Sequence, residues 1–435
     1  MTSTLGLSGD GAVHASLGKA AWRLLPFIVL LYFVSFLDRV NIGFAALTMN
    51  ADLGLSAAAY GTGAGIFFLG YFLFEIPSNV ILERVGARRW ISRILVTWGL
   101  LSISMAFVVG PVSFWIVRFF LGMAEAGFFP GIILYLTYWF PAPVRARITS
   151  RFLIALPLSS AVGAPVSTWL LGTQLFGFHG WQSMFLLEGL PAIILGIMVL
   201  RLLPDRPRHA RWLTAAEAEA IEAALVAEPA TSTTLRSGLT GARVWHLASI
   251  YFGIVVALYG FSFWAPQAIK GFGGLSNQQV GFLSAIPYLA VIPAMLIWAH
   301  HSDRSRERRW HIALPALLAG LAFGAGALVE APALRLILFV IAAVGIYATL
   351  PVFWTLPSSF LGGTGAAGGI ALINAVGNLG GYFGPSAIGL LKDRYGYGAS
   401  FAVLAISLVV AGVLALALRR TGENTPEISH EGIGR

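Results

Sequence analysis

Long apolar runs recur along the whole chain, and each is about as long as the twenty residues that a helix needs to cross a bilayer. The first run covers residues 22–47, which is too long for the apolar core of a signal peptide. Only 11% of the 435 residues are charged, whereas ordinary soluble domains carry about 25%. So few charges cannot cover a water-soluble surface. The sequence therefore predicts a polytopic membrane protein that lies in the lipid bilayer.

The residue types that are missing exclude several classes of function. The chain has no cysteine, which removes disulfides, iron–sulfur clusters and thiolate metal sites. It has neither an HExxH motif nor the phosphate-binding loop of ATPases, so we expect no metal, no cofactor and no ATP-driven work. A net charge of +9 is compatible with a nucleic-acid partner, but the distribution of the basic residues indicates membrane topology instead, and we expect no nucleic acid.

Twelve apolar runs, separated by Gly, Pro or charge clusters, predict twelve membrane helices. Only helices satisfy their backbone groups alone in lipid, and the runs are too long for barrel strands, so the predicted fold is all-α. The first six runs cover residues 22–47, 59–82, 91–109, 112–140, 148–171 and 181–203. The second six cover residues 245–269, 280–299, 312–329, 334–356, 369–391 and 401–418.

The longest polar stretch divides the chain into two halves. We predict an N-terminal tail at 1–21, a first half at 22–203, a linker at 204–244, a second half at 245–418 and a C-terminal tail at 419–435. Within the linker, Thr214 and Glu217 form the pattern of a capping box, which predicts a short surface helix up to Glu228. The linker is either a plain solvated connection or a regulatory segment.

Basic residues are distributed unequally between alternate loops. The predicted side that carries both chain ends collects 22 of the 28 Lys and Arg residues. Because cytoplasmic loops of membrane proteins are enriched in Lys and Arg, both termini, the linker and both tails are predicted to be cytoplasmic.

An internal repeat supports the division into halves. Residues 83–90 recur as residues 303–310, displaced by 220 residues, with an acid, three arginines and a tryptophan in register. Each copy follows the second predicted helix of its half, which indicates two six-helix halves of parallel topology.

This arrangement resembles the major facilitator superfamily along essentially the whole chain. Residues 37–45, 118–127 and 259–266 are similar to the anion:cation symporter family, and the third segment to its branch of bacterial tartrate, phthalate and hydroxyphenylacetate transporters. The glycine that opens the loop motif of the superfamily is replaced by Asn79 and Ala299. The resemblance implies a secondary transporter and not an enzyme, placed as a multi-pass, monomeric protein in a bacterial inner membrane.

Ionisable residues inside the membrane are functional candidates because burying a charge there is costly. They all lie in the first half, whereas residues 245–418 have no Asp, Glu, Lys or Arg deep within a predicted helix. One half is therefore expected to handle charge and the other to shape a cavity. The six residues are Asp38, Arg39, Glu75, Arg118, Glu125 and Glu188.

Asp38 and Glu125 are the candidates for reversible protonation, because they match the coupling acids of the family and a shielded carboxylate binds a proton more readily. The alternative is a static ion pair with Arg39 or Arg118. The planar guanidinium of Arg39 suits two-point binding of a substrate carboxylate. Arg118 is either a partner of Glu125 or a substrate ligand.

The remaining candidates have simpler roles. Glu75 and Glu188 are expected to be structural. Tyr71, Trp354 and Asn374 match cavity-lining positions of the family, and Asn378 lies one helical turn after Asn374, so these four are predicted substrate contacts. In the repeated loops, Glu83, Arg84 and Arg88, and equally Asp303, Arg304 and Arg308, are predicted to form a cytoplasmic gate in which Arg84 and Arg304 make ion pairs.

The predicted function is proton-coupled symport of a small organic anion, a carboxylate, by alternating access. The alternative is a proton-coupled antiporter that exports drugs or metabolites, which the segment Gly163-Ala164-Pro165 indicates weakly. An intramembrane enzyme is disfavoured because no nucleophile can be paired with a base. A channel is disfavoured because it needs neither repeated loop motifs nor paired acids.

Overall fold

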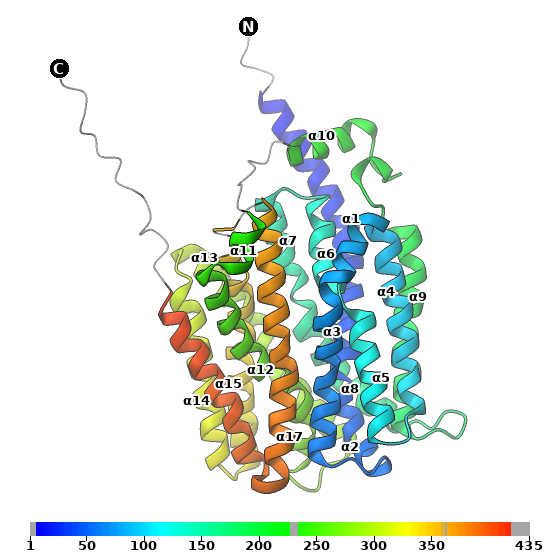
Figure 1. Ribbon diagram of the computed structural model, residues 1–435, viewed down its shortest axis with the longest axis vertical. Coiled ribbons are helices and arrows are strands. Elements are labelled where there is room, and N and C mark those ends of the chain that lie inside the picture. The colour runs from blue at the N-terminus through cyan, green and yellow to red at the C-terminus, as the bar shows by residue number, and fades with distance from the viewer. Residues whose placement is uncertain (1–5, 227–233, 359, 362, 419–435) are drawn as a thin grey trace, which may run out of the picture.

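The computed structural model is a bundle of helices aligned roughly along one axis (Figure 1). It describes residues 6–226, 234–358, 360–361 and 363–418, and within these residues it contains no β-strand. The C-terminal tail predicted at 419–435 and the first five residues of the N-terminal tail lie outside the described residues.

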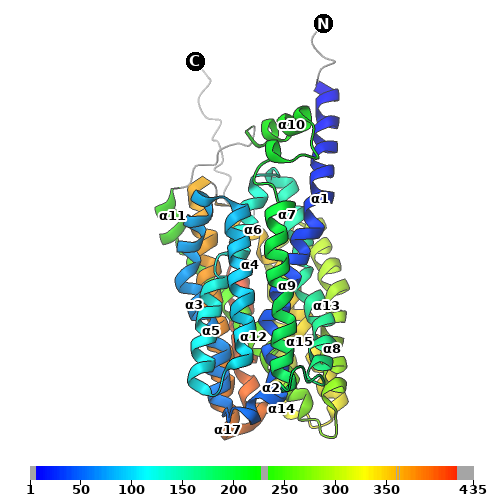
Figure 2. The ribbon, with the colours of Figure 1, turned by 90° about the vertical axis from the view of Figure 1, so that its right-hand side faces the viewer.

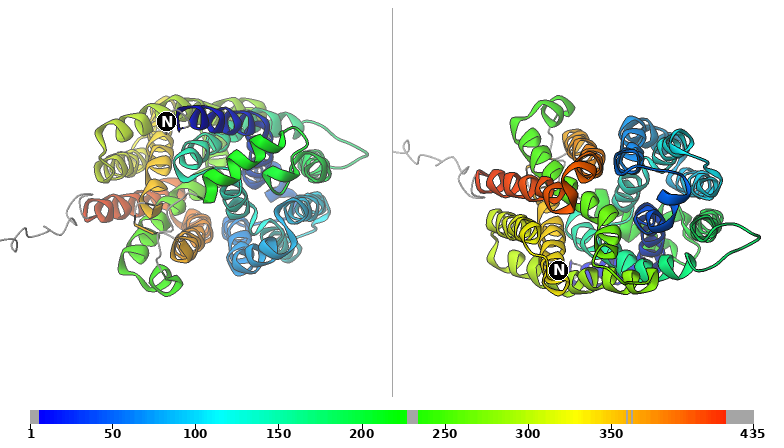
Figure 3. Two further views of the ribbon diagram at one scale, coloured as in Figure 1. Left: turned by 90° about the horizontal axis from the view of Figure 1, so that it is seen from above. Right: turned by 90° about the horizontal axis from the view of Figure 1, so that it is seen from below.

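The helices form two groups that lie side by side (Figures 1 and 3). The first half consists of α1 Gly6–Val40, α2 Ile42–Asp52, α3 Ala57–Val85, α4 Ala87–Ser104, α5 Pro111–Glu125, α6 Phe128–Thr137, α7 Ala142–Phe152, α8 Ala155–Leu170 and α9 Gly180–Leu202, with the 3-10 turn Met105–Phe107 after α4. The second half consists of α12 Ala242–Lys270, α13 Asn277–Ser305, α14 Arg309–Leu328, α15 Pro332–Phe353, α16 Thr355–Ser358 and α17 Gly363–Leu416.

Among the described residues, ten helical stretches are long and apolar enough to cross a membrane. The difference from the twelve predicted helices arises at two places. The predicted fifth helix is divided into α7 and α8, and neither is long enough to be counted. The eleventh and twelfth lie together in α17, which is interrupted by non-helical geometry at Gly396 (φ 72°, ψ −177°), a conformation that glycine adopts at little cost.

The internal repeat also has a structural counterpart. Ser56 caps the start of α3 by accepting a hydrogen bond from the backbone N–H of Ala59 (3.1 Å). Ser276, displaced by the same 220 residues, caps α13 through the N–H of Gln279 (3.2 Å). Capping residues of this type satisfy the free N–H groups at a helix start. The second long helix of each half therefore begins at the same register of the repeat.

The described chain begins on one side of the bundle (Figure 2), and its last helix runs back toward the same side (Figure 1), which we call the terminal side. The loops 83–90 and 303–310 lie there, as do the linker helices α10 Ala215–Val226 and α11 Leu235–Thr240 and the 3-10 turn Pro207–His209. The predicted capping box is confirmed: the N–H of Thr214 donates to Glu217 (2.8 Å), and the N–H of Glu217 donates to Thr214 (3.2 Å). Lys19 of α1 pairs with Glu217 at 2.8 Å and fastens α10 to α1.

On the side opposite the termini, the two halves pack closely through small residues. A Cβ atom on Gly61 of α3 would lie 2.4 Å from the carbonyl oxygen of Pro385 in α17. A Cβ atom on Gly281 of α13 would lie 1.9 Å from the hydroxyl of Thr168 in α8. Any larger residue at these positions would push the halves apart, as in other membrane helix contacts made by small residues. The bundle is thus closed on this side.

Candidate substrate and proton site

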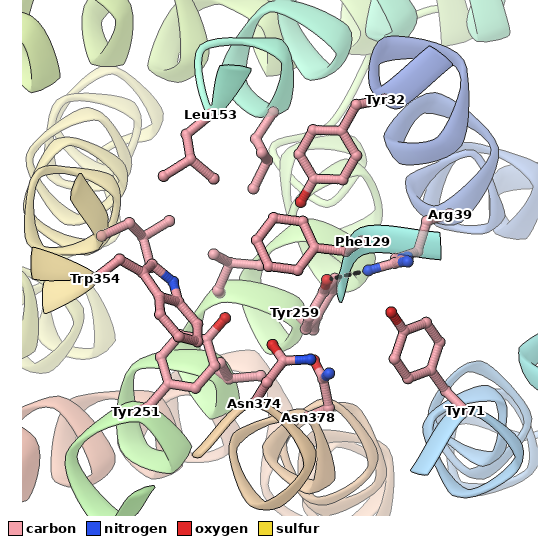
Figure 4. A pocket seen from close by; sticks show the side chains of 14 residues that line it. Tyr32, Arg39, Tyr71, Phe129, Leu153, Tyr251, Tyr259, Trp354, Asn374 and Asn378 are labelled. Carbon is pink, nitrogen blue, oxygen red and sulfur yellow. Dashed lines mark hydrogen bonds between the residues drawn. The ribbon is translucent and has the colours of Figure 1, made fainter. Parts of the chain in front are cut away.

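A small cavity lies between the two halves (Figure 4). It has a volume of about 30 Å³, which is room for roughly two water molecules. Side chains of both halves converge on it, and Arg39 is the one charged residue among them. The lining consists of Tyr32, Arg39, Tyr71, Phe129, Leu153, Leu156, Tyr251, Val255, Leu258, Tyr259, Leu350, Trp354, Asn374 and Asn378.

Arg39 lies near the end of α1 and is 5% exposed. Its guanidinium forms an ion pair with Glu125 of α5 and donates a second hydrogen bond to the Tyr259 hydroxyl of α12 (2.8 Å). Its Cζ atom lies 5.3 Å from the centre of the Tyr71 ring, within the range of cation–π attraction. The Arg39 Nε atom has no hydrogen-bond partner. Arg39 is thus the charged contact between the cavity and the acid behind it.

Glu125 does not line the cavity, although it is bonded to the residue that does. One of its oxygens accepts hydrogen bonds from Arg39 and from the Ser35 hydroxyl (2.8 Å), and the side chain is 1% exposed. The helix stops at this residue because Gly127 has a φ of 85°, a left-handed conformation, before α6 begins. An anion that enters the cavity would meet Arg39 and compete with Glu125 for it.

Asp38 lies in a different network on the other face of α1. It accepts hydrogen bonds from the Trp98 indole and the Ser102 hydroxyl, both on α4. The Asn41 amide also donates to it (3.3 Å) and, in the same orientation, to Glu188 of α9 (2.9 Å). The structure therefore brings Glu125, but not Asp38, to Arg39.

Arg118 of α5 is fully buried and does not line the cavity. Its guanidinium donates to the carbonyl oxygens of Gly63 (3.4 Å) and Ala64 (3.0 Å) on α3, and lies 4.9 Å from the centre of the Phe67 ring. It forms no direct ion pair with Glu125 among the described contacts, because its side chain is directed at the α3 backbone. In this conformation Arg118 joins two helices of the first half.

Of the six residues predicted as substrate contacts, Arg39 and the four neutral ones line the cavity, whereas Arg118 does not. Tyr71 faces Arg39 from α3, and Trp354 follows the end of α15 (Figure 4). Trp354 packs edge to face with Tyr251, at 5.0 Å between ring centres. Asn374 and Asn378 reach the cavity from α17.

Two features of the site were missed by the sequence analysis. Glu75 of α3 is fully buried and accepts a hydrogen bond from Asn374 of α17, so it joins the two halves beside the cavity. The tyrosines Tyr251 and Tyr259 also contribute hydroxyls to the site. Their spacing of eight residues places them on one face of α12, and this signal was available.

The repeated loops differ from the prediction in the arginines that make the ion pairs. Arg88 lies against Asp205, which accepts its backbone N–H at 2.8 Å and lies 3.7 Å from its Nε atom. Arg308 pairs with Asp303 at 2.7 Å. Among the described residues, Glu83, Arg84 and Arg304 are exposed and form no ion pair. Arg84 lies in the last turn of α3 and faces solvent, whereas Arg88 lies in the first turn of α4 beside Asp205.

Solved structures with the same fold exist. A bacterial homologue of the human lysosomal transporter Spinster superposes with a TM-score of 0.73, covering 91% of this chain and 96% of that one at 17% sequence identity. At this identity the similarity concerns the fold alone.

Bacterial relatives are considerably closer in sequence. A protein of Agrobacterium vitis that is named for tartrate transport is 51% identical, covering 94% of this chain and 93% of its own length. A protein of Pseudomonas putida, named as the metabolite transport protein NicT, is 43% identical over 94% of this chain and 95% of its own. A quinolone resistance transporter of Acinetobacter baumannii is 42% identical over 86% and 88%.

The sequence profile of the Major Facilitator Superfamily matches residues 28–381 and 274–433. The relatives and the fold of this chain are those of transporters rather than enzymes. Its apolar helices are those of a multi-pass protein of the bacterial inner membrane. The chain belongs to the major facilitator superfamily, in the bacterial branch of the tartrate-type transporters.

Proposed function

We propose that this protein is a symporter that takes up a small organic carboxylate together with protons. The observation that carries the proposal is the ion pair between Arg39, the one charged residue of the cavity lining, and Glu125 behind it. A substrate carboxylate needs the guanidinium that Glu125 occupies. Two carboxylates on one buried arginine repel each other, so a proton on Glu125 favours substrate binding. Substrate and proton are thereby bound together.

The substrate class follows from the chemistry of the lining. One guanidinium recognises one carboxylate through two parallel hydrogen bonds. The tyrosine hydroxyls and the amides of Asn374 and Asn378 offer further hydrogen bonds without charge. A small hydroxy acid satisfies this set, and the relatives named for tartrate transport agree with it.

Transport requires the halves to move, because a cavity of about 30 Å³ has no room for such a substrate. We propose alternating access, in which residues 22–203 and 245–418 rock as two six-helix units about the central site, with the linker 204–244 between them. The proposal includes twelve membrane crossings, cytoplasmic termini and a monomer. The excess of basic residues on the terminal side supports this orientation.

The proposal is tested with purified protein in liposomes that carry a pH gradient. We expect uptake of labelled tartrate or another hydroxy acid to follow the gradient, and to stop when an ionophore removes it. Arg39→Lys, which keeps the charge but loses the two-point geometry, should weaken substrate binding. Gradient-independent uptake, or unchanged binding by the Lys variant, would contradict the proposal.

A second candidate is export of an aromatic drug or metabolite in exchange for protons. The relative named as a quinolone resistance transporter favours it, as do the rings of Phe129, Tyr251 and Trp354 around the cavity. The same liposomes separate the two functions. An exporter moves a labelled quinolone in the direction opposite to the protons, so that the drug accumulates on the more acidic side, and it does not transport tartrate.

A further inference from the structure

A second cavity lies at the terminal side of the second half, away from the central site. Its volume is about 270 Å³, far more than one water molecule needs. Four arginines line it, and we call it the arginine pocket: Arg243 at the start of α12, and Arg306, Arg308 and Arg309 in and after the loop between α13 and α14.

The positive charge of the arginine pocket is not neutralised by the described residues. Four arginines and Glu307 give the lining a net charge of 4 − 1 = +3. Arg308 is paired with Asp303, but Arg306 and Arg309 have no acidic partner among the described residues. The Arg309 Nε atom is buried without a hydrogen-bond partner. Guanidinium groups gathered in one cavity repel each other unless an anion lies between them.

Glu307 cannot supply that anion because its oxygens are already occupied. They accept the backbone N–H of Trp310 (2.9 Å) and the Nδ1 atom of His311 (2.9 Å). Burial opposes ionisation of Glu307, but these hydrogen bonds outweigh it and lower the pKa of its carboxyl below the ordinary value. Its negative charge is therefore directed at the start of α14 rather than at the arginines.

The first half shows what the arginine pocket lacks. The repeated loop of that half is closed by Asp205, three residues after α9, which accepts the backbone N–H of Arg88 and forms an ion pair with its side chain. In the second half, Leu418 lines the pocket beyond the end of α17. The repeat displacement of 220 residues places Thr425 opposite Asp205, and Thr425 lies outside the described residues. Among the described residues, no acid after α17 takes the place that Asp205 has after α9.

We propose that the arginine pocket binds a phosphate or phosphodiester anion in the position that Asp205 occupies in the first half. Arginine binds phosphate oxygens through paired hydrogen bonds, and basic pockets at the membrane surface bind anionic headgroups. Leu247 and Leu356 add an apolar wall, and Trp310, which is 51% exposed, lies at the rim. Tryptophan is typical of the membrane interface. The phosphate comes either from an anionic phospholipid or from solution.

The test measures ligand-induced thermal stabilisation of the full-length protein in neutral detergent. Short-chain phosphatidylglycerol and inorganic phosphate are titrated separately, with phosphatidylcholine of the same chain length and sodium chloride of equal ionic strength as references. We expect a saturable rise of the unfolding temperature with phosphatidylglycerol, with phosphate, or with both. A response to phosphatidylglycerol alone identifies a lipid site, and an equal response to phosphate identifies a soluble anion.

Variants assign the response to the pocket. Arg306→Gln with Arg309→Gln should weaken the anion affinity about tenfold or more, because two charged hydrogen-bond donors are lost. Arg89→Gln is the matched control, since Arg89 occupies the same loop position as Arg309 in the half that Asp205 closes. Leu418→Asp supplies an internal acid and should abolish the response while keeping the arginines.

Two results would overturn the proposal. One is an equal response of the wild type, the double variant and the Arg89→Gln control to every anion, which would show binding elsewhere. The other is stabilisation by phosphatidylcholine as strong as by phosphatidylglycerol, which would show that acyl chains and not anionic charge are recognised. If the double variant does not fold, the loss or retention of the response in Leu418→Asp decides in the same way.

Discussion

The two halves share a repeat and a fold, but they differ in the chemistry of their interiors. The first half buries Asp38, Arg39, Arg118 and Glu125 at 5% exposure or less. The second half contributes Trp354, Asn374, Asn378 and tyrosines to the same cavity. The two halves of the repeat are thus a charged half and a neutral half. Energy coupling should depend on the first, and the choice of substrate on the second.

The largest expected effect breaks coupling in the charged half. Glu125→Gln resembles a permanently protonated acid, so the variant should lose accumulation driven by a pH gradient and still exchange labelled for unlabelled substrate. Asp38→Asn, in the separate network, should do the same if both acids carry protons. Uptake and exchange are measured side by side in liposomes.

The exposed acid Glu83 gives the matched control for that experiment, because Glu83→Gln removes one exposed carboxylate of the same half that forms no ion pair among the described residues. A purely structural acid would lower folded yield and both activities together, since its loss leaves a buried arginine unpaired. Full gradient-driven uptake by both variants would exclude these acids as proton carriers.

The next effect concerns binding. Arg39→Lys should weaken substrate affinity by about 1 to 3 kcal/mol, roughly tenfold to a hundredfold, because an ammonium group cannot form the paired hydrogen bonds of a guanidinium. Equilibrium binding measured in the Glu125→Gln background separates the loss of substrate affinity from proton coupling. Arg93→Lys is the control, because Arg93 lies near the start of α4, toward the terminal side of the bundle. Equal affinities in the wild type and Arg39→Lys would refute the anchor role.

A smaller effect is expected in the neutral half. Trp354→Ala removes a ring from the cavity wall and should cost planar aromatic acids about 0.5 to 1.5 kcal/mol more than it costs tartrate. The proton dependence of uptake should not change. Competition constants for a panel of acids measure the loss of affinity, and uptake measured at several pH values gives the proton dependence. Trp169, which is 62% exposed, provides the control Trp169→Phe. A changed proton dependence would contradict the division between the halves.

The smallest effect compares the two repeated loops. Asp205→Asn and Asp303→Asn each remove a partly exposed ion pair, worth about 0 to 1 kcal/mol, and should shift the conformational population only a few-fold. Asp205 joins the segment after α9 to α4, which is distant in sequence, whereas Asp303 at the end of α13 pairs with Arg308 five residues later. The first substitution should therefore have the larger effect. Because the chain has no cysteine, labelling of Leu153→Cys reports access to the cavity. Identical labelling in all three proteins would remove the gate role.

The sequence predicts most of the fold because each membrane helix is encoded locally by its apolar run. It fails where the backbone departs from that run. The break at Gly127 lies inside the apolar run 112–140, where hydropathy does not change. The interruption at Gly396, in contrast, falls between the eleventh and twelfth predicted helices, where charged residues separate the two runs. Tyr71, Trp354, Asn374 and Asn378 do line the cavity as predicted. Their prediction needs only the position of each residue on its own segment of the chain, and no contact between two helices has to be known.

Contacts between helices are harder to predict. The bond between Glu75 and Asn374 joins residues 299 positions apart, and it depends on how α3 crosses α17. The separation of Asp38 from Glu125 likewise depends on the rotation of α1 about its axis, which their depth in the membrane does not determine. The partner of Arg88 was missed because Asp205 lies in the linker, outside the repeated segment.

The pair of Arg39 and Glu125 has no net charge. Moving one elementary charge through the membrane potential involves about 2.3 kcal/mol per 100 mV. If the protein changes between its outward-facing and inward-facing states with this ion pair formed, the pair carries no net charge through the membrane potential. When a protonated Glu125 and a bound carboxylate replace the pair, the sum at Arg39 is again zero. We therefore expect voltage to act on the charges that the substrate carries beyond its first carboxylate, and a monoanion and a dianion should differ in the current that accompanies their transport.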